Sequence, residues 1–277
     1  MSSMTRRQVL RHAGQAATVL AIGLPGTGAA SNSQAASQTG TKRLKIIVAG
    51  GHPGDPEYGC GGTIARYARL GHEVVLLYLN NGEWSRLLGG AAASTRTAEA
   101  SKACQILKAR PAYAGQVNGR AVLDSSHFDE FRKILEAERP DAVFTQWPID
   151  AHRDHRATSA LAFDAWLQMH KSFALYYYEV SNGEDTLQFS PTHYVDITAT
   201  EPTKRAACYA HASQTPDRFY ALQDQVAKFR GIESGYQRAE AFVLQAQSPY
   251  EALPASGVWN LKSEIGNLKS GVSMDLK

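Results

Sequence analysis

From residue 44 onward the chain alternates short apolar runs with longer amphipathic stretches, and this alternation constrains its fold more than any other feature. The runs over 44–50 and 72–79 consist mainly of Val, Ile, Leu and other apolar residues. Nearly continuous apolar runs of this length are typical of strands covered on both faces, and the stretches between them are long enough for crossover helices. The pattern predicts an α/β fold: a Rossmann-like, mostly parallel sheet with helices on both faces, in a single domain.

The remaining elements follow in the same alternation. We expect further strands at 112–117, 141–147, 175–180, 193–197 and 241–244, and helices over 63–70, 94–109, 128–138, 155–170, 202–212 and 216–232. The stretch Gly59-Cys60-Gly61-Gly62 is interpreted as a turn before the first helix. Because no repeat or linker divides this region, 41–246 is predicted to be one domain, and the polar stretch 247–277 a peripheral tail.

The first forty residues have the composition of a targeting segment. Arg6 and Arg7 precede a weakly apolar stretch from Ala16 to Leu24, and small residues that suit cleavage follow. This order is typical of a secretory signal, and the arginine pair resembles a twin-arginine signal. A disordered basic tail is the alternative. We therefore expect a periplasmic or secreted protein whose mature chain starts between Ala30 and Gly40.

Charge and cysteine content narrow the possible partners. Of the 29 Lys and Arg residues, Arg6, Arg7 and Arg11 lie in the targeting segment, which leaves 26 against 26 Asp and Glu. A neutral chain lacks the basic footprint of a nucleic-acid binder, and no later run reaches the ~18 apolar residues of a membrane span. Three widely spaced cysteines imply no disulfide framework. A small molecule or a glycan is the expected partner, while the oligomeric state is not encoded in these patterns.

Two clusters of imidazoles and carboxylates follow predicted strands. His52 and Asp55 come after the run 44–50, and His152, Asp154 and His155 come after the run 141–147. Loops that leave neighbouring parallel strands at their carboxyl ends meet in one crevice. Mixed nitrogen and oxygen ligands suit Zn²⁺, and three of them leave a position open for water. The sequence predicts one Zn²⁺ per chain, with the alternative that Asp55 and Asp154 are merely helix N-caps.

These residues carry a family resemblance. The stretch 52–63, His-Pro-Gly-Asp-Pro-Glu-Tyr-Gly-Cys-Gly-Gly-Thr, resembles the His-Pro-Asp-Asp opening motif of the LmbE/PIG-L zinc-dependent N-deacetylases, and 152–156 resembles their His-x-Asp-His motif. Arg96-Thr97-Ala98-Glu99 matches the Arg-x-x-Glu helix of that family, a weak match by itself. Residues 204–214 and 239–242 resemble its C-terminal segment, so the similarity extends from about 44 to 244.

The resemblance implies hydrolysis of an N-acetyl group, commonly from an N-acetylglucosamine-type sugar, at one zinc ion. It implies that His52, Asp55 and His155 are the ligands. His152 would stabilise the oxyanion or protonate the leaving amine, and Asp154 would orient the His152 imidazole. These roles agree with the chemistry, because a bound metal lowers the pKa of water and polarises a carbonyl, and an imidazolium stabilises a developing oxyanion.

One position departs from the family motif. The first Asp after His-Pro, which the family resemblance implies to be the general base, is Gly54 here. Three explanations stay open: another carboxylate replaces it, the metal activates water without a strong base, or the activity is lost or changed. Asp150 and Glu57 are the nearest replacements, although Asp150 also suits a turn and Glu57 the first turn of a helix.

Other candidate residues have weaker support. Arg96 begins a helix near the predicted site and could bind a sugar hydroxyl or a phosphate, or pair with a neighbouring acid. His211 and Gln214 could line the pocket or lie on a helix surface. Two rival functions remain: a non-catalytic or altered-chemistry zinc- and sugar-binding homologue, and a nucleotide-binding Rossmann protein. The second is weak, because the glycines of 59–62 do not have the Gly-x-Gly-x-x-Gly spacing.

Overall fold

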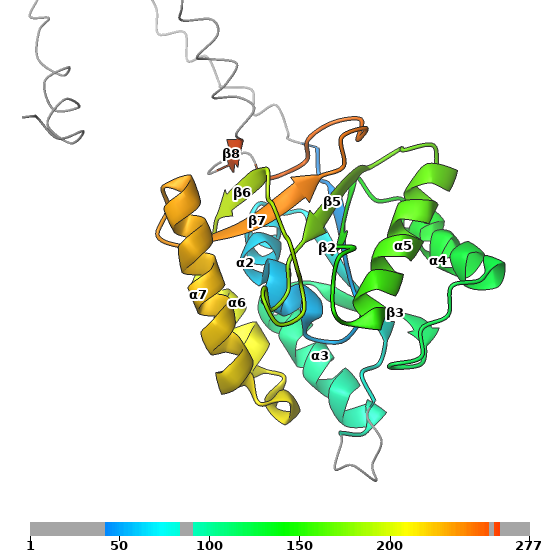
Figure 1. Cartoon of the computed structure of the whole chain (residues 1–277), viewed down its shortest axis with the longest axis horizontal. Helices are drawn as coiled ribbons and strands as arrows, with labels where there is room; N and C mark the ends of the chain where they lie inside the picture. Colours follow the sequence, from blue (N-terminus) through cyan, green and yellow to red (C-terminus); the bar gives the residue numbers. More distant parts are fainter. Residues whose placement is uncertain (1–41, 84–90, 255–257, 261–277) are drawn as a thin grey trace, which may run out of the picture. The chain divides into compact units, whose positions relative to one another are not determined.

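The computed structural model describes residues 42–83, 91–254 and 258–260, which form one α/β unit. In these ranges an eight-stranded sheet has the order β3–β2–β1–β4–β5–β7–β6–β8 (Figure 1). Its parallel strands are β1 (Lys45–Gly50), β2 (Glu73–Asn80), β3 (Arg110–Gln116), β4 (Ala142–Gln146) and β5 (Ala174–Tyr178). The antiparallel strands are β6 (His193–Asp196), β7 (Ala239–Leu244) and β8 (Val258–Asn260).

Helices cover both faces of the sheet (Figure 1). One face packs against α2 (Asp55–Arg69), α3 (Ala93–Leu107), α6 (Glu201–Tyr209) and α7 (Pro216–Ser234). The other face packs against α4 (Ser125–Glu138) and α5 (Arg153–Gln168). Successive strand residues point to opposite faces, so Ile46 lies in the first core and Ile47 in the second. The prediction of one mostly parallel α/β domain is confirmed.

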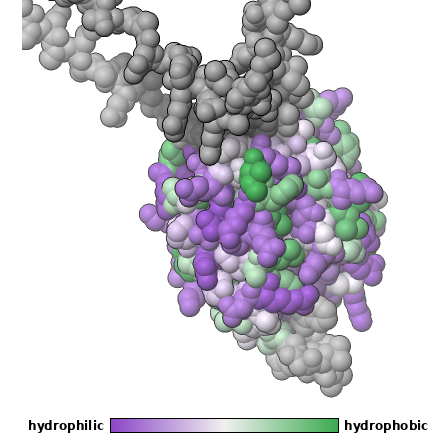
Figure 2. Space-filling model, turned by 60° about the vertical axis from the view of Figure 1, so that its left-hand side comes forward, coloured by the Kyte–Doolittle hydropathy of each residue, from purple (hydrophilic) through white to green (hydrophobic). Residues whose placement is uncertain are grey.

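The outer surface is mainly hydrophilic on the side shown in Figure 2, with small, separate apolar patches between the polar side chains. This distribution is expected of helices that bury one apolar stripe against a sheet.

Helix α2 starts eight residues earlier than its sequence pattern predicts, and Gly59-Cys60-Gly61-Gly62 is helical rather than a turn. The glycines are needed for close packing: a Cβ on Gly59 would lie 2.4 Å from the Tyr178 ring, and one on Gly62 would lie 2.5 Å from the Ile197 side chain. A cluster of glycines is usually a turn signal. Here it lets the helix approach strand β5 and the end of β6.

The C-terminal stretch also differs from the prediction of a peripheral tail. Ala252 is buried in the first core, where its carbonyl accepts a hydrogen bond from Tyr67 and its amide donates one to Tyr176. Strand β8 pairs with β6. An unpaired sheet edge favours pairing with any nearby chain, which polarity alone does not reveal. The predicted targeting segment and the rest of the tail lie outside the described residues. Within the described residues, no helix is long and apolar enough to cross a membrane.

The strand order places one topological switch point between β1 and β4. From β1 the chain adds β2 and then β3 on one side, and it returns to the other side of β1 with β4. The loops after β1 and β4 therefore leave adjacent carboxyl ends in opposite directions, which opens a crevice between them.

Candidate active site

The loop after β1 is held in place by the end of β4. Gly51 donates its backbone N–H to Gln146 Oε1 at 2.8 Å, and Gln146 Nε2 donates to Asp55 Oδ2 at 3.1 Å. Asp55 is the first residue of α2, and Gly54 before it has φ 115°, a conformation that other residues rarely adopt. Strand β4 thus fixes the turn that carries His52 and Asp55.

Asp55 is the centre of the site. Its Oδ2 lies 3.2 Å from His52 Nδ1 and 3.2 Å from His155 Nε2. Ring nitrogens of His52, His152 and His155 also lie within 4.8 Å of one another. A carboxylate oxygen that faces two imidazole nitrogens is a donor set that fits a zinc-class cation. The structure therefore brings together the three ligands expected from sequence, and it adds His152 to the same group.

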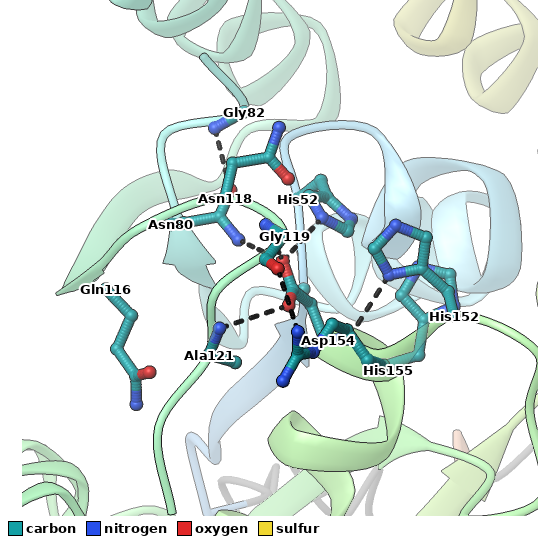
Figure 3. A network of polar contacts seen from close by, with 12 residues as sticks. His52, Asn80, Gly82, Gln116, Asn118, Gly119, Ala121, His152, Asp154 and His155 are labelled. Carbon is teal, nitrogen blue, oxygen red and sulfur yellow. Dashed lines mark hydrogen bonds and ion pairs between the residues drawn. The ribbon is translucent and has the colours of Figure 1, made fainter. Parts of the chain in front are cut away.

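Two further carboxylates stand behind the imidazoles. Asp150 Oδ1 contacts His155 Nδ1 at 3.1 Å, and Asp154 Oδ2 contacts His52 Nε2 at 3.2 Å. Asp154 also accepts hydrogen bonds from the Asn80 side chain and from the backbone amides of Gly119 and Ala121 (Figure 3). Carboxylates in this position orient metal-binding imidazoles and raise their basicity.

These contacts correct three expectations. The carboxylate of Asp150 is used by His155, by the His152 amide and by Thr186 Oγ1, so it is not available as a replacement base. Asp154 orients His52 rather than His152. The carboxylate of Asp154 contacts His52, and Asp154 contacts His152 through its backbone amide, which donates to His152 Nδ1 at 3.2 Å. Loop spacing could not distinguish these partners, because residues two or three apart in a tight loop point in different directions.

The third expectation concerns Glu57 as a replacement for the missing general base. Its side chain is fully buried and accepts hydrogen bonds from Tyr78 Oη at 2.7 Å and from the Gly54 amide at 3.1 Å, and its Oε1 lies 2.9 Å from His211 Nε2. It holds the turn at Gly54 in place and does not line the pocket. Its interpretation as a first-turn helix residue agrees with this position.

The charges of the cluster depend on one another. Burial by itself would lower the pKa of His155, but Asp55 and Asp150 outweigh it and raise that pKa to about 10. Burial also opposes ionisation of Asp55, yet the charges of His155 and His52 hold the pKa of Asp55 well below its usual range. Without a metal, protons on the imidazoles balance the buried carboxylates. A divalent cation can take over this role.

His152 differs from the other two histidines. Its ring stacks on His155 at 4.7 Å between centroids and meets His52 edge-on at 4.6 Å. Burial and the neighbouring charges of His52 and His155 lower its pKa, so the neutral form is favoured. Because Nδ1 accepts from a backbone amide, the proton of the neutral ring lies on Nε2. His152 therefore offers a hydrogen-bond donor beside the residues that are expected to bind the metal.

The cluster lies in a pocket of about 240 Å³. Besides His52, Asp55 and His155, it is lined by Pro53, Gly54, Tyr58, Gly82, Arg96, His152, Val180, Ser181, Asp185, His211, Gln214 and Phe219. Arg96 is positioned both to bind substrate and to pair with a neighbouring acid. It lines the pocket, and its Nη1 lies 3.5 Å from Glu99. Its Nη2 donates to the Pro53 carbonyl at 2.6 Å.

Sequence reasoning missed the contribution of the loop after β5, which brings Val180, Ser181 and Asp185 to the pocket. The rule that loops at the carboxyl ends of parallel strands carry the site applies to β5 as well. The polar sequence Ser181-Asn182-Gly183-Glu184-Asp185 contains no histidine, and it looks like an ordinary turn.

Comparison with known proteins agrees with this geometry. Residues 47–166 match the family model PIG-L, described as GlcNAc-PI de-N-acetylase. The diacetylchitobiose deacetylase of Thermococcus kodakarensis is 26% identical over 227 residues, which cover 71% of this chain and 81% of that protein.

Solved structures share the fold. A conserved protein from Thermus thermophilus has a TM-score of 0.64 and 27% identity, over 77% of this chain and 99% of that chain. The 4-carboxy-2-hydroxymuconate hydratase of Pseudomonas putida has a TM-score of 0.64 and 21% identity, over 76% of this chain and 98% of that chain.

The fold, the histidine and aspartate cluster and these relatives define a metal-dependent amidohydrolase. More narrowly, residues 47–166 contain a PIG-L/LmbE family domain.

Proposed function

We propose that this protein is a zinc-dependent hydrolase that removes an N-acetyl group from an N-acetylglucosamine-type sugar or a related amide. The observation that carries the proposal is the position of Asp55 Oδ2 between His52 Nδ1 and His155 Nε2, within the pocket of a PIG-L/LmbE domain. The name of the relative from Thermococcus kodakarensis, a diacetylchitobiose deacetylase, supports the substrate class.

His52, Asp55 and His155 would hold the zinc ion, with Asp154 and Asp150 behind the two imidazoles. When bound, zinc lowers the pKa of water and polarises the amide carbonyl. His152 donates from Nε2 towards the oxygen on which negative charge develops, and a donor placed there lowers the barrier. Because the neutral ring does not release this proton, His152 would act on the oxyanion and not as the acid for the leaving amine.

Arg96 is suited to holding the substrate. The residue is 3% exposed, and its Nε and Nη1 make no hydrogen bond among the described residues, although Nη1 lies in an ion pair with Glu99 at 3.5 Å. A buried donor without a partner costs free energy. A sugar hydroxyl or another substrate oxygen in the pocket would satisfy these donors, and Arg96 would then select for polar, hydroxylated substrates.

Gly54 favours a second candidate, an enzyme of altered chemistry. The family resemblance implies a carboxylate at this position, and none is present. The hydratase from Pseudomonas putida shows that a protein with this fold can carry a different reaction. Adding an Asp at Gly54 is an unsuitable test of this point, because its φ of 115° would strain any side chain there.

The test is release of acetate from a panel of N-acetyl sugars, with metal content measured in parallel. We expect about one zinc per chain, and a chelator should abolish release. His155→Ala should lose both zinc and activity, whereas His170→Asn, which changes an exposed histidine outside the site, should keep both. Full zinc content in His155→Ala would remove His155 from the ligand set. No acetate from any sugar with the zinc-loaded protein would favour altered chemistry.

A further inference from the structure

Within the described part of the pocket lining, no group stands out as the acceptor of a proton from the attacking water. Among the described residues, the carboxylates that line it are Asp55 and Asp185. Asp55 Oδ2 is already in contact with His52, His155 and Gln146. Asp150 and Glu57, the candidates nearest in sequence, are buried behind the site. Asp185 is therefore the pocket carboxylate that no metal-ligand contact occupies.

The loop that carries Asp185 is attached to the loop of the metal site. Ala151 donates its backbone N–H to the Asp185 carbonyl at 2.8 Å, and Asp150 and Thr186 form an antiparallel bridge. The Asp185 amide donates to the Ser181 carbonyl at 2.9 Å. These bonds fix the backbone of Asp185 next to the segment that ends in His152. The side chain itself is half-buried, so water and substrate can reach it.

We propose that Asp185 is the general base of this enzyme and replaces the carboxylate that is missing at Gly54. In the reaction, a water oxygen bonds to the carbonyl carbon of the N-acetyl group while Asp185 takes a proton from that water. The C–N bond then breaks, and the amine nitrogen receives the proton that Asp185 took from the water. The products are acetate and the free amine, and no other reactant is required.

The surroundings of Asp185 suit this role. Burial is the main cause that raises the pKa of Asp185, and the charges of Asp55 and Asp150 add to it, while His155 and a hydrogen bond with Ser181 act in the opposite direction. A carboxylate with a raised pKa is a better proton acceptor near neutral pH. The position of Asp185 in the pocket, its attachment to the loop after β4 and its raised pKa therefore all support a role as general base.

The test, which rests on the proposed deacetylase function, compares Asp185→Asn, Asp185→Ala and the control Glu184→Gln, an exposed carboxylate one residue away. The assay measures liberated amine from N-acetyl sugars, because formate will be added. We expect Asp185→Asn to lower kcat by about 10²–10⁴, with zinc content and melting temperature close to wild type. Glu184→Gln should keep the wild-type rate. Formate should restore part of the rate of Asp185→Ala by supplying a carboxylate.

The outcomes separate this proposal from the function on which it rests. Amine release by wild type together with an unchanged kcat in Asp185→Asn would overturn the role of Asp185 and leave the deacetylase intact. A rise in KM without a fall in kcat, and no rescue by formate, would assign Asp185 to substrate binding and equally overturn it. No release by zinc-loaded wild type would overturn the proposed function, and the base role with it.

Discussion

Two groups of buried charges in this molecule are balanced by different kinds of cation. In the first, which we call the structural pairs, Arg230 binds Glu179 through two hydrogen bonds of 2.6 and 2.8 Å, and Lys204 Nζ lies 2.6 Å from Glu240. In the second, the metal cluster, Asp55, Asp150 and Asp154 face imidazoles. Imidazoles change their charge near neutral pH, whereas arginine does not and lysine ordinarily does so only far above it.

The difference separates a structural role from a functional one. Both structural pairs have further partners: Glu240 also accepts the amides of Gly62 and Thr63 and so ties α2 to β7, and Arg230 also donates to Glu233. The metal cluster contains three carboxylates, and its balance without metal depends on protonated imidazoles. It also opens into the pocket. The structural pairs therefore hold elements of the fold together, whereas the metal cluster, whose partners are titratable and which opens into the pocket, leaves room for a ligand.

The largest effect is expected from breaking a structural pair. Lys204→Met leaves Glu240 buried and unpaired, which should lower the free energy of unfolding by about 3–5 kcal/mol. The zinc content of the folded protein should be unchanged. Urea denaturation and metal analysis measure the two quantities. Lys204→Met combined with Glu240→Gln should recover most of the stability, since no unpaired charge remains. A loss below about 1 kcal/mol would place this pair with weak surface ion pairs.

A smaller effect of a different kind is expected in the metal cluster. Asp154→Asn removes the carboxylate that faces His52 Nε2 and should weaken zinc affinity about 10–100-fold. Competition with a chelator of known affinity measures this change. The matched control is Asp164→Asn, further along α5, where zinc affinity should remain at the wild-type value. Equal affinities in both variants would show that Asp154 only anchors the loop at Gly119.

The smallest effect is a pH dependence of the metal-free protein. His155 has a folded pKa of about 10 against an ordinary value of 6.5. Its contribution to the free energy of unfolding is therefore complete below about pH 6.5 and is lost as the pH rises towards 10. Asp55, whose pKa is lowered, contributes to the free energy of unfolding above about pH 3.8, and this contribution is lost as the pH falls further. The melting temperature without metal should therefore decline from pH 6.5 to 8.5.

The stabilisation by zinc should instead increase over the same pH range, because imidazoles must be unprotonated to bind zinc. The gain in melting temperature on adding zinc should grow from pH 6.5 to 8.5. Thermal unfolding with and without zinc measures both trends. A metal-free melting temperature that stays flat over this range would contradict the balance by protonated imidazoles.

The strands and the two histidine clusters could be predicted because they depend on local patterns. Apolar runs covered on both faces identify β1, β2 and β4, and a strand end next to His or Asp identifies a site in a parallel sheet. The roles of Asp150, Asp154 and Glu57 could not be predicted. Their partners are Thr186, Asn80 and His211, which lie 36, 74 and 154 residues away along the chain.

The sequence by itself therefore determined the fold class and the parallel core and predicted candidate metal ligands, because hydrophobic periodicity and side-chain chemistry are properties of short segments. Only the tertiary structure decided that the glycines of 59–62 continue a helix against Tyr178, that 258–260 completes the sheet, and that Asp185 lines the pocket while Asp150 does not. Each of these depends on what another part of the chain places within a few ångströms, and distance along the sequence carries no information about that.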